Sequence, residues 1–541
     1  MKTTAVKMGV IAMLCLSNYA CKQEKSLITE EPVGSLKSKS KTSALTCTQQ
    51  TEQTDYSIYK MTSDGYRVGD VAPYYDEATG KFVIYYLKDI WDDATNNRHP
   101  MYAFTTNNFH TYTATGQIIG SSSATCAQDN AVGAGSVVKS GSTYYFFYSG
   151  RNNNYLSCGG KLEGVVRASS SSPTTAFTKN TSFPTITVPM GQGYDENDNF
   201  RDPYVFLDGS TWHMLLTARK NVNGTWKGVI VRYTSTNLTN WTHQGVLYDG
   251  GPTNYFNMEC PQMVKLGSTY YLIYSDQQNK YMYYRKSSSL TGPWSAPTSN
   301  SRFEGNGFFA GKIATDQYGD SYIFAWTQIL SGHTDSGSWI WGGNMVVHKI
   351  YQRANGDLAV TIPHTLQANL NTNTYSLVKS SQWGNVTNTV PGTQSYRVIS
   401  PAPQDVANVI YEPVNQQKYK ISAIVRYASS SKDFGFMIGA CDGYNNFYSL
   451  RFVPSQNRFS FDKTAHGSIT STTVATNDVP FPMTANTDYN VEIVVENSMV
   501  VVYIDNVAAL SCRIYKAQTT NWGIFSDNSD ATFSNITVKY P

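Results

Sequence analysis

Three acidic residues of this sequence share one local pattern, in which a proline follows the acid within three positions. They begin the segments Asp70-Val-Ala-Pro73, Asp202-Pro203 and Glu259-Cys-Pro261. Cleavage of a glycosidic bond needs two carboxyl groups, one to protonate the leaving oxygen and one to attack the anomeric carbon or activate water. A third carboxylate can hold sugar hydroxyls and stabilise positive charge in the transition state. These residues are therefore candidates for glycosidase chemistry, provided that the fold brings them together.

A repeated strand pattern supplies a fold that does so. Five short runs of aromatic and aliphatic residues, each preceded by a turn-forming pair or triplet, recur every 50 to 70 residues or so; they begin at Phe82, Tyr144, Trp212, Tyr270 and Tyr322. Runs of this length and character are typical of buried strands, and no helix-period stretch of useful length separates them. About four strands repeated five times predict an all-β fold, a five-bladed β-propeller.

The three acids occur at the same point of the repeated unit. One strand precedes each aromatic strand, and in three units it opens with Asp70, Asp202 or Glu259. In the other two units it opens with the small residues of segments 133–136 and 309–311. If the units are equivalent blades, we expect the three acids at equivalent positions, converging at one end of the central channel. Two carboxyl groups held close together repel, which favours one protonated and one ionised group.

The remaining sequence divides into further regions. The propeller, a catalytic domain, is predicted over 46–360 and a linker over 361–385. Alternating strands over 386–541 predict a β-sandwich.

The N-terminus is typical of an exported bacterial protein. Residues 1–21 contain lysines, then a short apolar core, and end at Ala20-Cys21, which predicts a lipoprotein signal with Cys21 lipidated. Residues 22–45 are rich in Lys, Ser, Thr and Glu and predict a flexible tether. We expect a cell-surface or periplasmic lipoprotein; simple secretion is the alternative. Membrane contact is expected only through this anchor.

Composition narrows the classes of partner. The 541 residues carry a formal net charge of +3 without a basic patch in sequence, which argues against nucleic-acid binding. Aromatic residues make up 13% of the chain, as expected for a protein that stacks on sugars. The histidines and cysteines show no metal-ligand spacing, so we expect no metal. Cys126 and Cys158 are either a disulfide pair or two free thiols. The sequence leaves the oligomeric state open.

Two motifs resemble a known family. Arg201-Asp202-Pro203 is similar to the Arg-Asp-Pro motif of the invertases, inulinases and levanases of glycoside hydrolase family 32. Glu259-Cys260 resembles the Glu-Cys motif of that family, in which the glutamate is the general acid/base. Asp70 stands in the place of the nucleophilic aspartate, although the usual Trp-Met-Asn-Asp-Pro-Asn-Gly pattern around it is absent. The resemblance covers roughly residues 60–541 and is closest to a divergent bacterial subgroup.

The resemblance implies a retaining fructosidase that needs no metal or organic cofactor and acts on a fructan or fructoside such as levan, inulin or sucrose. It implies that Asp70 is the nucleophile, Glu259 the acid/base and Asp202 the transition-state stabiliser. Among further residues at plausible family positions we expect four to bind substrate, namely Arg201, Ser136, Trp326 and Trp341.

Three other classes stay open at this point. An arabinan- or xylan-cleaving propeller enzyme also uses three acids, but Glu259-Cys260 is not its usual acid signature. A non-catalytic surface glycan-binding protein fits the tether, the aromatic residues and the sandwich, yet it has no need for all three acids. A structural propeller needs none of them.

Overall fold

We describe a computed structural model of the chain, which covers residues 55–298, 302–403, 406–441, 446–463, 466, 469–470, 473, 475–515 and 520–541. The predicted signal, Cys21, the tether and the first residues of the predicted propeller domain lie outside these ranges. In the described ranges, neither α-helix is long and apolar enough to span a bilayer.

Five antiparallel blades form the N-terminal domain, which confirms the predicted β-propeller. Blade one contains β1 (Val68–Asp76), β2 (Lys81–Lys88), β5 (Met101–Thr106) and β6 (Thr113–Ile119). Blade two contains β7 (Ala131–Ser140), β8 (Thr143–Arg151), β9 (Glu163–Ser170) and β10 (Thr178–Lys179). Blade three contains β11 (Arg201–Asp208), β12 (Thr211–Val222), β13 (Thr225–Ser235) and β14 (Thr242–Tyr248). Blade four contains β15 (Met258–Leu266), β16 (Thr269–Asp276) and β17 (Met282–Ser287). Blade five contains β18 (Phe308–Thr315), β19 (Ser321–Leu330), β20 (Trp339–Gln352) and β21 (Leu358–Thr361).

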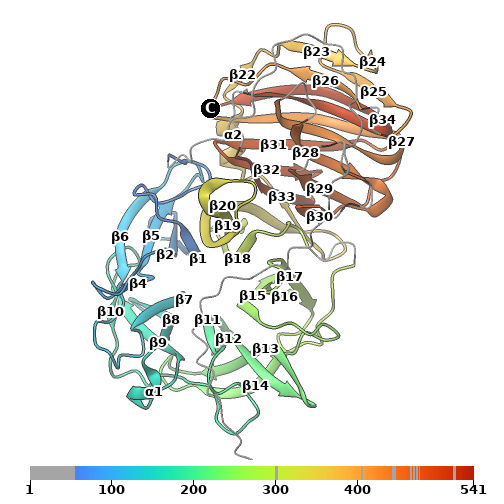
Figure 1. Cartoon of the computed structure of the whole chain (residues 1–541). Coiled ribbons are helices and arrows are strands. Elements are labelled where there is room, and N and C mark those ends of the chain that lie inside the picture. The colour runs from blue at the N-terminus through green and yellow to red at the C-terminus, as the bar shows by residue number, and fades with distance from the viewer. Residues whose placement is uncertain are drawn as a thin grey trace, which may run out of the picture. The chain divides into compact units, whose positions relative to one another are not determined.

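The first strands of the blades form a closed inner ring. β1 contacts β7 and β18, β7 contacts β11, and β15 contacts both β11 and β18. Figure 1 shows these strands following one another from blue through green to yellow. Blade five also pairs with blade one through Val68 and Gly343. The aromatic runs found in the sequence are the second strands, and residues such as Tyr85, Phe146 and Tyr274 are buried between blades, so apolar packing holds the ring.

Short elements decorate the propeller. The hairpin of β3 (Trp91–Asp92) and β4 (Asn97–Arg98) leaves blade one, α1 (Tyr155–Cys158) leaves blade two, and a 3-10 turn (Ser331–His333) leaves blade five. The stretch predicted as a linker, 361–385, is structured: it contains α2 (His364–Leu370), β22 (Asn373–Tyr375) and β23 (Lys379–Trp383). Leu366 and Leu370 of α2 are buried, which explains why this segment is ordered.

The C-terminal domain is a β-sandwich, drawn in orange and red in Figure 1. Its other strands are β24 (Asn385–Asn388), β25 (Tyr396–Ser400), β26 (Ala407–Tyr411), β27 (Lys418–Cys441), β28 (Asn446–Val453), β29 (Arg458–Asp462), β30 (Asn477–Pro480), β31 (Tyr489–Glu496), β32 (Met499–Ile504), β33 (Ala508–Arg513) and β34 (Asn521–Tyr540), with a 3-10 turn at Pro454–Gln456. The long strands β27 and β34 pair along most of their lengths, with register shifts that let each contribute to both layers. One apolar core fills the space between the layers.

Buried polar contacts join the sandwich to blade five. The Glu304 carboxylate, which precedes β18, accepts hydrogen bonds from the backbone and hydroxyl of Ser511, each at 2.8 Å. It also pairs with His348 Nε2 at 2.8 Å, and His348 Nδ1 lies 2.9 Å from the Tyr503 hydroxyl. The sandwich therefore supports the propeller beside β18, one of the five strands of the inner ring.

Candidate active site

Each strand of the inner ring is interrupted at the same place. Its pairing with the second strand of the blade shifts register by one extra residue, so that two residues of the inner strand lie opposite one of its partner. The shifts fall between Gly69 and Ala72, Val132 and Gly135, Arg201 and Tyr204, Glu259 and Gln262, and Phe309 and Lys312. A β-bulge of this kind re-aims the side chains around it. Asp70 and Asp202 lie in these bulges and Glu259 directly precedes one, so the bulges set the direction of all three side chains.

The register corrects one expectation. Asp70 and Asp202 are equivalent, because each is the first bulged residue of its strand. Glu259 lies one position earlier and is equivalent to Arg201, while Cys260 occupies the position of Asp202. Asp202 and Cys260 adopt positive φ angles, 61° and 49°. The bulge therefore turns the backbone so that neighbouring positions, and not one repeated position, supply the acids.

Asp70 is held by a tryptophan of blade five. Trp326 Nε1 donates a hydrogen bond of 3.0 Å to Asp70 Oδ1, and Trp326 is itself only 3% exposed. Burial and the neighbouring charge of Asp202 raise the pKa of Asp70 from 3.8 to about 7, although the bond from Trp326 opposes this rise. Trp326, predicted to bind substrate, is thus a residue that positions the candidate nucleophile and favours its ionised form.

Glu259 is held by Arg201 of the preceding blade. Arg201 Nη2 donates to Glu259 Oε1 at 2.7 Å, and the Glu259 side chain is 14% exposed. Burial raises the pKa of Glu259 above its usual 4.5; Arg201 lowers it, and Asp202 raises it. Burial lowers the pKa of Arg201, but Glu163, Glu259 and Asp202 together raise it well above its usual value. A carboxyl group that resists ionisation is suited to protonate a leaving group.

Asp202 is fixed from three sides. Its Oδ2 accepts hydrogen bonds from the Cys260 backbone N–H and the Thr217 hydroxyl, both at 3.1 Å. Its backbone N–H donates to Ser149 Oγ at 2.8 Å. Because blades two, three and four all contribute to these bonds, Asp202 has little freedom to move. Its charge raises the pKa of both Asp70 and Glu259, so the three acids are electrostatically one site.

The other two residues expected to bind substrate have different surroundings. Ser136 is buried, and its hydroxyl donates to the Pro203 carbonyl at 3.0 Å and accepts from Val205 N–H at 2.9 Å. Ser136 thus ties blade two to blade three next to Asp202, and its contact with substrate stays a prediction. Trp341 packs over Gly69, where an added Cβ would lie 2.1 Å from its ring. Only glycine allows the tryptophan so close to the Asp70 bulge.

Trp341 continues into an aromatic row. It stacks on His99 with centroids 4.5 Å apart, and His99 meets Trp91 edge to face at 5.2 Å. Trp91, on the β3–β4 hairpin, is 46% exposed. Burial and the charges of Arg67 and Arg151 lower the pKa of His99 to about 4, so it is neutral at pH 7. The row is therefore an uncharged aromatic surface that leads away from Asp70.

Sequence reasoning missed several residues of the site. Glu163 accepts from Arg201, Lys312 is buried near Asp70 with Nζ 2.6 Å from the Gly135 carbonyl, and Thr217 bonds Asp202. Lys312 lies at the end of a predicted inner strand and Glu163 at the start of another strand. In both cases a charged residue next to an apolar strand was the sequence signal that could have indicated a site residue. Thr217 offers no such signal.

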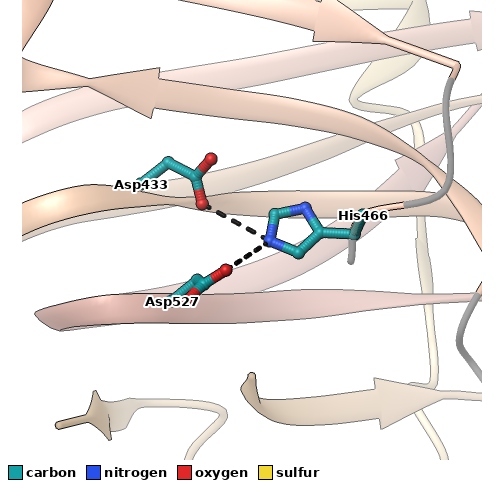
Figure 2. Close-up of side chains that lie close together, drawn as sticks. All are labelled: Asp433, His466 and Asp527. Carbon is teal, nitrogen blue, oxygen red and sulfur yellow. Dashed lines mark hydrogen bonds and ion pairs between the residues drawn. The ribbon is translucent and has the colours of Figure 1, made fainter. Parts of the chain in front are cut away.

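A second cluster of titratable groups lies in the sandwich (Figure 2). His466 Nε2 is 3.0 Å from Asp527 Oδ2 and 3.5 Å from Asp433 Oδ1, close enough for the three side chains to surround a metal ion. Both carboxylates already have cationic partners, however. Arg451 Nη1 donates to Asp433 at 2.7 Å, and the Lys432 ammonium bonds Asp527. A metal ion would have to compete with Lys432, so we interpret the cluster as a buried ion network.

The structure decides whether Cys126 and Cys158 are paired or free. Cys126 and Cys158 form a disulfide, with Cα atoms 5.4 Å apart. Cys260 and Cys512 are free and buried. Burial raises the pKa of the Cys260 thiol well above its usual range, and Cys260 acts as a small packed residue against Trp326 and Phe309.

Two family models match most of the chain. Residues 73–357 match the glycosyl hydrolases family 32 N-terminal domain, and residues 356–538 match the GH32, BT1760-like, C-terminal domain. Over 172 residues the chain is 27% identical to a sucrose-6-phosphate hydrolase of Escherichia coli, covering 30% of this chain and 35% of that protein. A raffinose invertase of Escherichia coli is 26% identical over 168 residues, covering 29% and 35%. The chain thus matches about a third of the length of these relatives.

Solved structures show the fold over nearly the whole chain. The sucrose-6-phosphate hydrolase of Lactobacillus gasseri superposes with a TM-score of 0.65 at 16% identity, covering 90% of this chain and 93% of that one. The fructan 1-exohydrolase IIa of Cichorium intybus superposes with a TM-score of 0.64 at 14% identity, covering 90% and 98%.

Proposed function

Because the chain belongs to glycosyl hydrolase family 32, we propose that it hydrolyses β-fructosidic bonds in a fructan or short fructoside such as levan, inulin or sucrose. The observation that carries the proposal is the cluster of Asp70, Asp202 and Glu259 at the bulges of the inner ring, in which the charge of Asp202 raises the pKa of the other two carboxyl groups. Each acid comes from a different blade, and each is oriented by a partner that the fold supplies.

We assign two steps to the cluster. In the first, Asp70 attacks the anomeric carbon of a fructosyl unit while Glu259 gives its proton to the leaving oxygen, which forms a covalent fructosyl–enzyme ester. In the second, Glu259 takes a proton from water, and the water oxygen displaces Asp70 with overall retention. Asp202 accepts hydrogen bonds from fructose hydroxyls and opposes the positive charge that develops on the ring.

The electrostatics support this division of roles. The hydrogen bond from Trp326 favours the anion at Asp70 and fixes its Oδ1, so we assign the attack to Oδ2. Burial keeps Glu259 protonated to higher pH than an exposed glutamate, as an acid catalyst requires. The aromatic row from Trp341 to Trp91 offers an apolar surface on which further sugar rings can stack.

The test is sugar release from levan, inulin and sucrose by the full chain and by Glu259→Gln. We expect release of fructose or fructo-oligosaccharides, and a fall in kcat of about 100-fold or more in the variant. Glu77→Gln is the matched control, because Glu77 is an exposed acid in the β1–β2 turn and its loss leaves the site intact.

The outcomes separate the competing functions. Cleavage of one polymer above the others assigns levanase or inulinase activity. Binding of these glycans without cleavage would favour the glycan-binding function, and cleavage of arabinan or xylan alone would contradict the proposed substrate class.

We further propose that the protein is exported and anchored through Cys21. The disulfide between Cys126 and Cys158 supports an oxidising compartment, because such bonds persist outside the cytosol. Fractionation of cells that express the full chain tests this: we expect wild type in the membrane fraction and Cys21→Ser outside it. Wild type that stays in the cytosol would contradict export.

A further inference from the structure

Arg201 is shared between two glutamates that lie on different blades. Its Nη2 donates to Glu259 Oε1 at 2.7 Å, and its Nη1 donates to Glu163 Oε2 at 3.3 Å. Asn199 Oδ1 also accepts from Nη1 at 3.3 Å. The guanidinium carries a single positive charge, so its effect on Glu259 depends on how much of that charge Glu163 offsets.

Burial and hydrogen bonds fix the Glu163 carboxylate beside Arg201. It opens strand β9 and is 6% exposed. Its Oε2 also accepts from the Phe200 backbone N–H at 3.0 Å, which ties it to the residue before Arg201. Its Oε1 accepts from Arg151 Nη1 at 3.1 Å, and the Arg151 side chain is 37% exposed. Glu163 therefore stands between an outer arginine and the arginine of the site.

We propose that Glu163 is a positioning residue that holds Arg201 and offsets its charge, so that Glu259 keeps the proton it gives to the leaving group. This inference rests on the proposed function. Arg201 stabilises an ionised Glu259, and a carboxylate on the far side of Arg201 weakens that effect. With Glu163 neutral, the whole charge of Arg201 acts on Glu259, which then ionises at lower pH and becomes a poorer acid at neutral pH.

Other charged groups surround the pair but do not substitute for Glu163. Asp202, Asp70 and Lys280 act on the charge of Glu259 from β11, β1 and the β16–β17 turn. Asp198 lies 3.9 Å from Arg151, and further charged residues line the small cavity beside Glu163: Lys161, Asp195 and Glu196. Among the residues that the structure describes, Glu163 is the carboxylate that shares the guanidinium of Arg201 with Glu259 while standing outside the candidate catalytic trio.

Glu163→Gln tests the charge of Glu163 separately from its hydrogen bonds. The glutamine oxygen can still accept from Phe200 N–H and Arg201 Nη1, so the geometry is kept and the charge alone is removed. The glutamine amide then faces Arg151, which is exposed enough to turn toward water. Arg151→Gln should have the opposite effect on Glu259. It removes a positive charge beside Glu163, so that the charge of Glu163 offsets the charge of Arg201 more fully.

The direct readout is the titration of the Glu259 carboxyl by 13C NMR of glutamate-labelled full-length protein, with the signal identified by its loss in Glu259→Gln. We expect Glu163→Gln to lower the pKa of Glu259 by about one unit, from a charge removed at short range in a partly buried site. Arg151→Gln should raise it by a smaller amount. The basic limb of kcat/KM should move in the same two directions.

A pKa of Glu259 that stays unchanged in Glu163→Gln would overturn the inference, even if kcat falls, because a merely structural residue lowers activity without moving the titration. The NMR titration needs no substrate. If wild type cleaves no fructoside, the proposed function fails, while the titration still decides whether Glu163 controls Glu259.

Discussion

The hydrogen bond from Trp326 to Asp70 predicts a specific change in pH dependence. Asp70 must be ionised to attack, so the acid limb of kcat/KM follows its pKa, which burial raises to about 7. The bond of 3.0 Å stabilises the anion. Its loss in Trp326→Phe raises the pKa further, and the acid limb should move to higher pH.

The size of this shift follows from the bond. A hydrogen bond to a charged group contributes about 1.5–3 kcal/mol, and one pKa unit corresponds to about 1.36 kcal/mol. The smaller phenylalanine leaves room for water near Asp70, which recovers part of the loss. We therefore expect a shift of about one pH unit, with kcat/KM about tenfold lower at pH values well below the wild-type limb and a smaller loss between the two limbs.

The assay is the pH profile of kcat/KM on the preferred fructoside. Trp341→Phe is the matched control, because Trp341 belongs to the same aromatic row, with its centroid 6.2 Å from that of Trp326, and makes no hydrogen bond to Asp70 among the described residues. If Trp326→Phe is folded and less active but its acid limb does not move, Trp326 only fills space and the reasoning is refuted.

Three further predictions concern stability. Asp70→Asn should abolish activity yet raise stability by about 4 kcal/mol above pH ~7, because wild type must ionise a carboxyl whose folded pKa is raised from 3.8 to about 7, and the gain should vanish below pH ~4, where that carboxyl is neutral in both states. Arg451→Met should destabilise the sandwich by about 3–5 kcal/mol, since it strips the partner from fully buried carboxylates, whereas Arg426→Met, at an exposed pair, should cost under ~1 kcal/mol. Replacing Cys126 and Cys158 by serine should cost about 3.5 kcal/mol, because the bond closes a loop of 32 residues.

Denaturation followed by circular dichroism checks all three. A lower stability of Asp70→Asn at high pH would contradict the raised pKa. Equal losses in Arg451→Met and Arg426→Met would show that the buried network matters no more than a surface pair. An unchanged midpoint in the double serine variant would argue that the disulfide stabilises only its own loop.

The spacing of the sequence repeats predicted much of the propeller fold, because a propeller repeats one supersecondary unit. The aromatic second strands and the three acids could be located from it, since buried strands and their preceding turns recur in sequence. The offset of Glu259 could not be predicted, because it depends on the bulges of β11 and β15, in which Asp202 and Cys260 adopt positive φ angles. Aspartate tolerates such a backbone without requiring it, and cysteine gives no signal of it. Only the three-dimensional register distinguishes one position from the next.

The partners of the acids were harder to predict for a different reason. Trp326 was placed near the substrate, whereas its indole N–H is used by Asp70. Ser136 was expected to bind sugar, and its hydroxyl also bridges two strands, a role that the sequence did not predict. The role of Glu163 could not be predicted, because it depends on a contact with Arg201, which lies 38 residues away along the chain. Such roles follow from hydrogen-bond geometry across blades, which strand patterns do not encode.

The central claim is that Asp70 forms a covalent bond to the fructosyl unit. Glu259→Gln lacks the base that releases this intermediate, and a fructosyl fluoride supplies a leaving group that needs no acid. After incubation and rapid denaturation, peptide mass mapping should find one fructosyl unit on the peptide that contains Asp70, and none when Asp70→Asn is added. An adduct on another residue, or turnover of the fluoride without any adduct in Glu259→Gln, would contradict the assignment of Asp70 as the nucleophile.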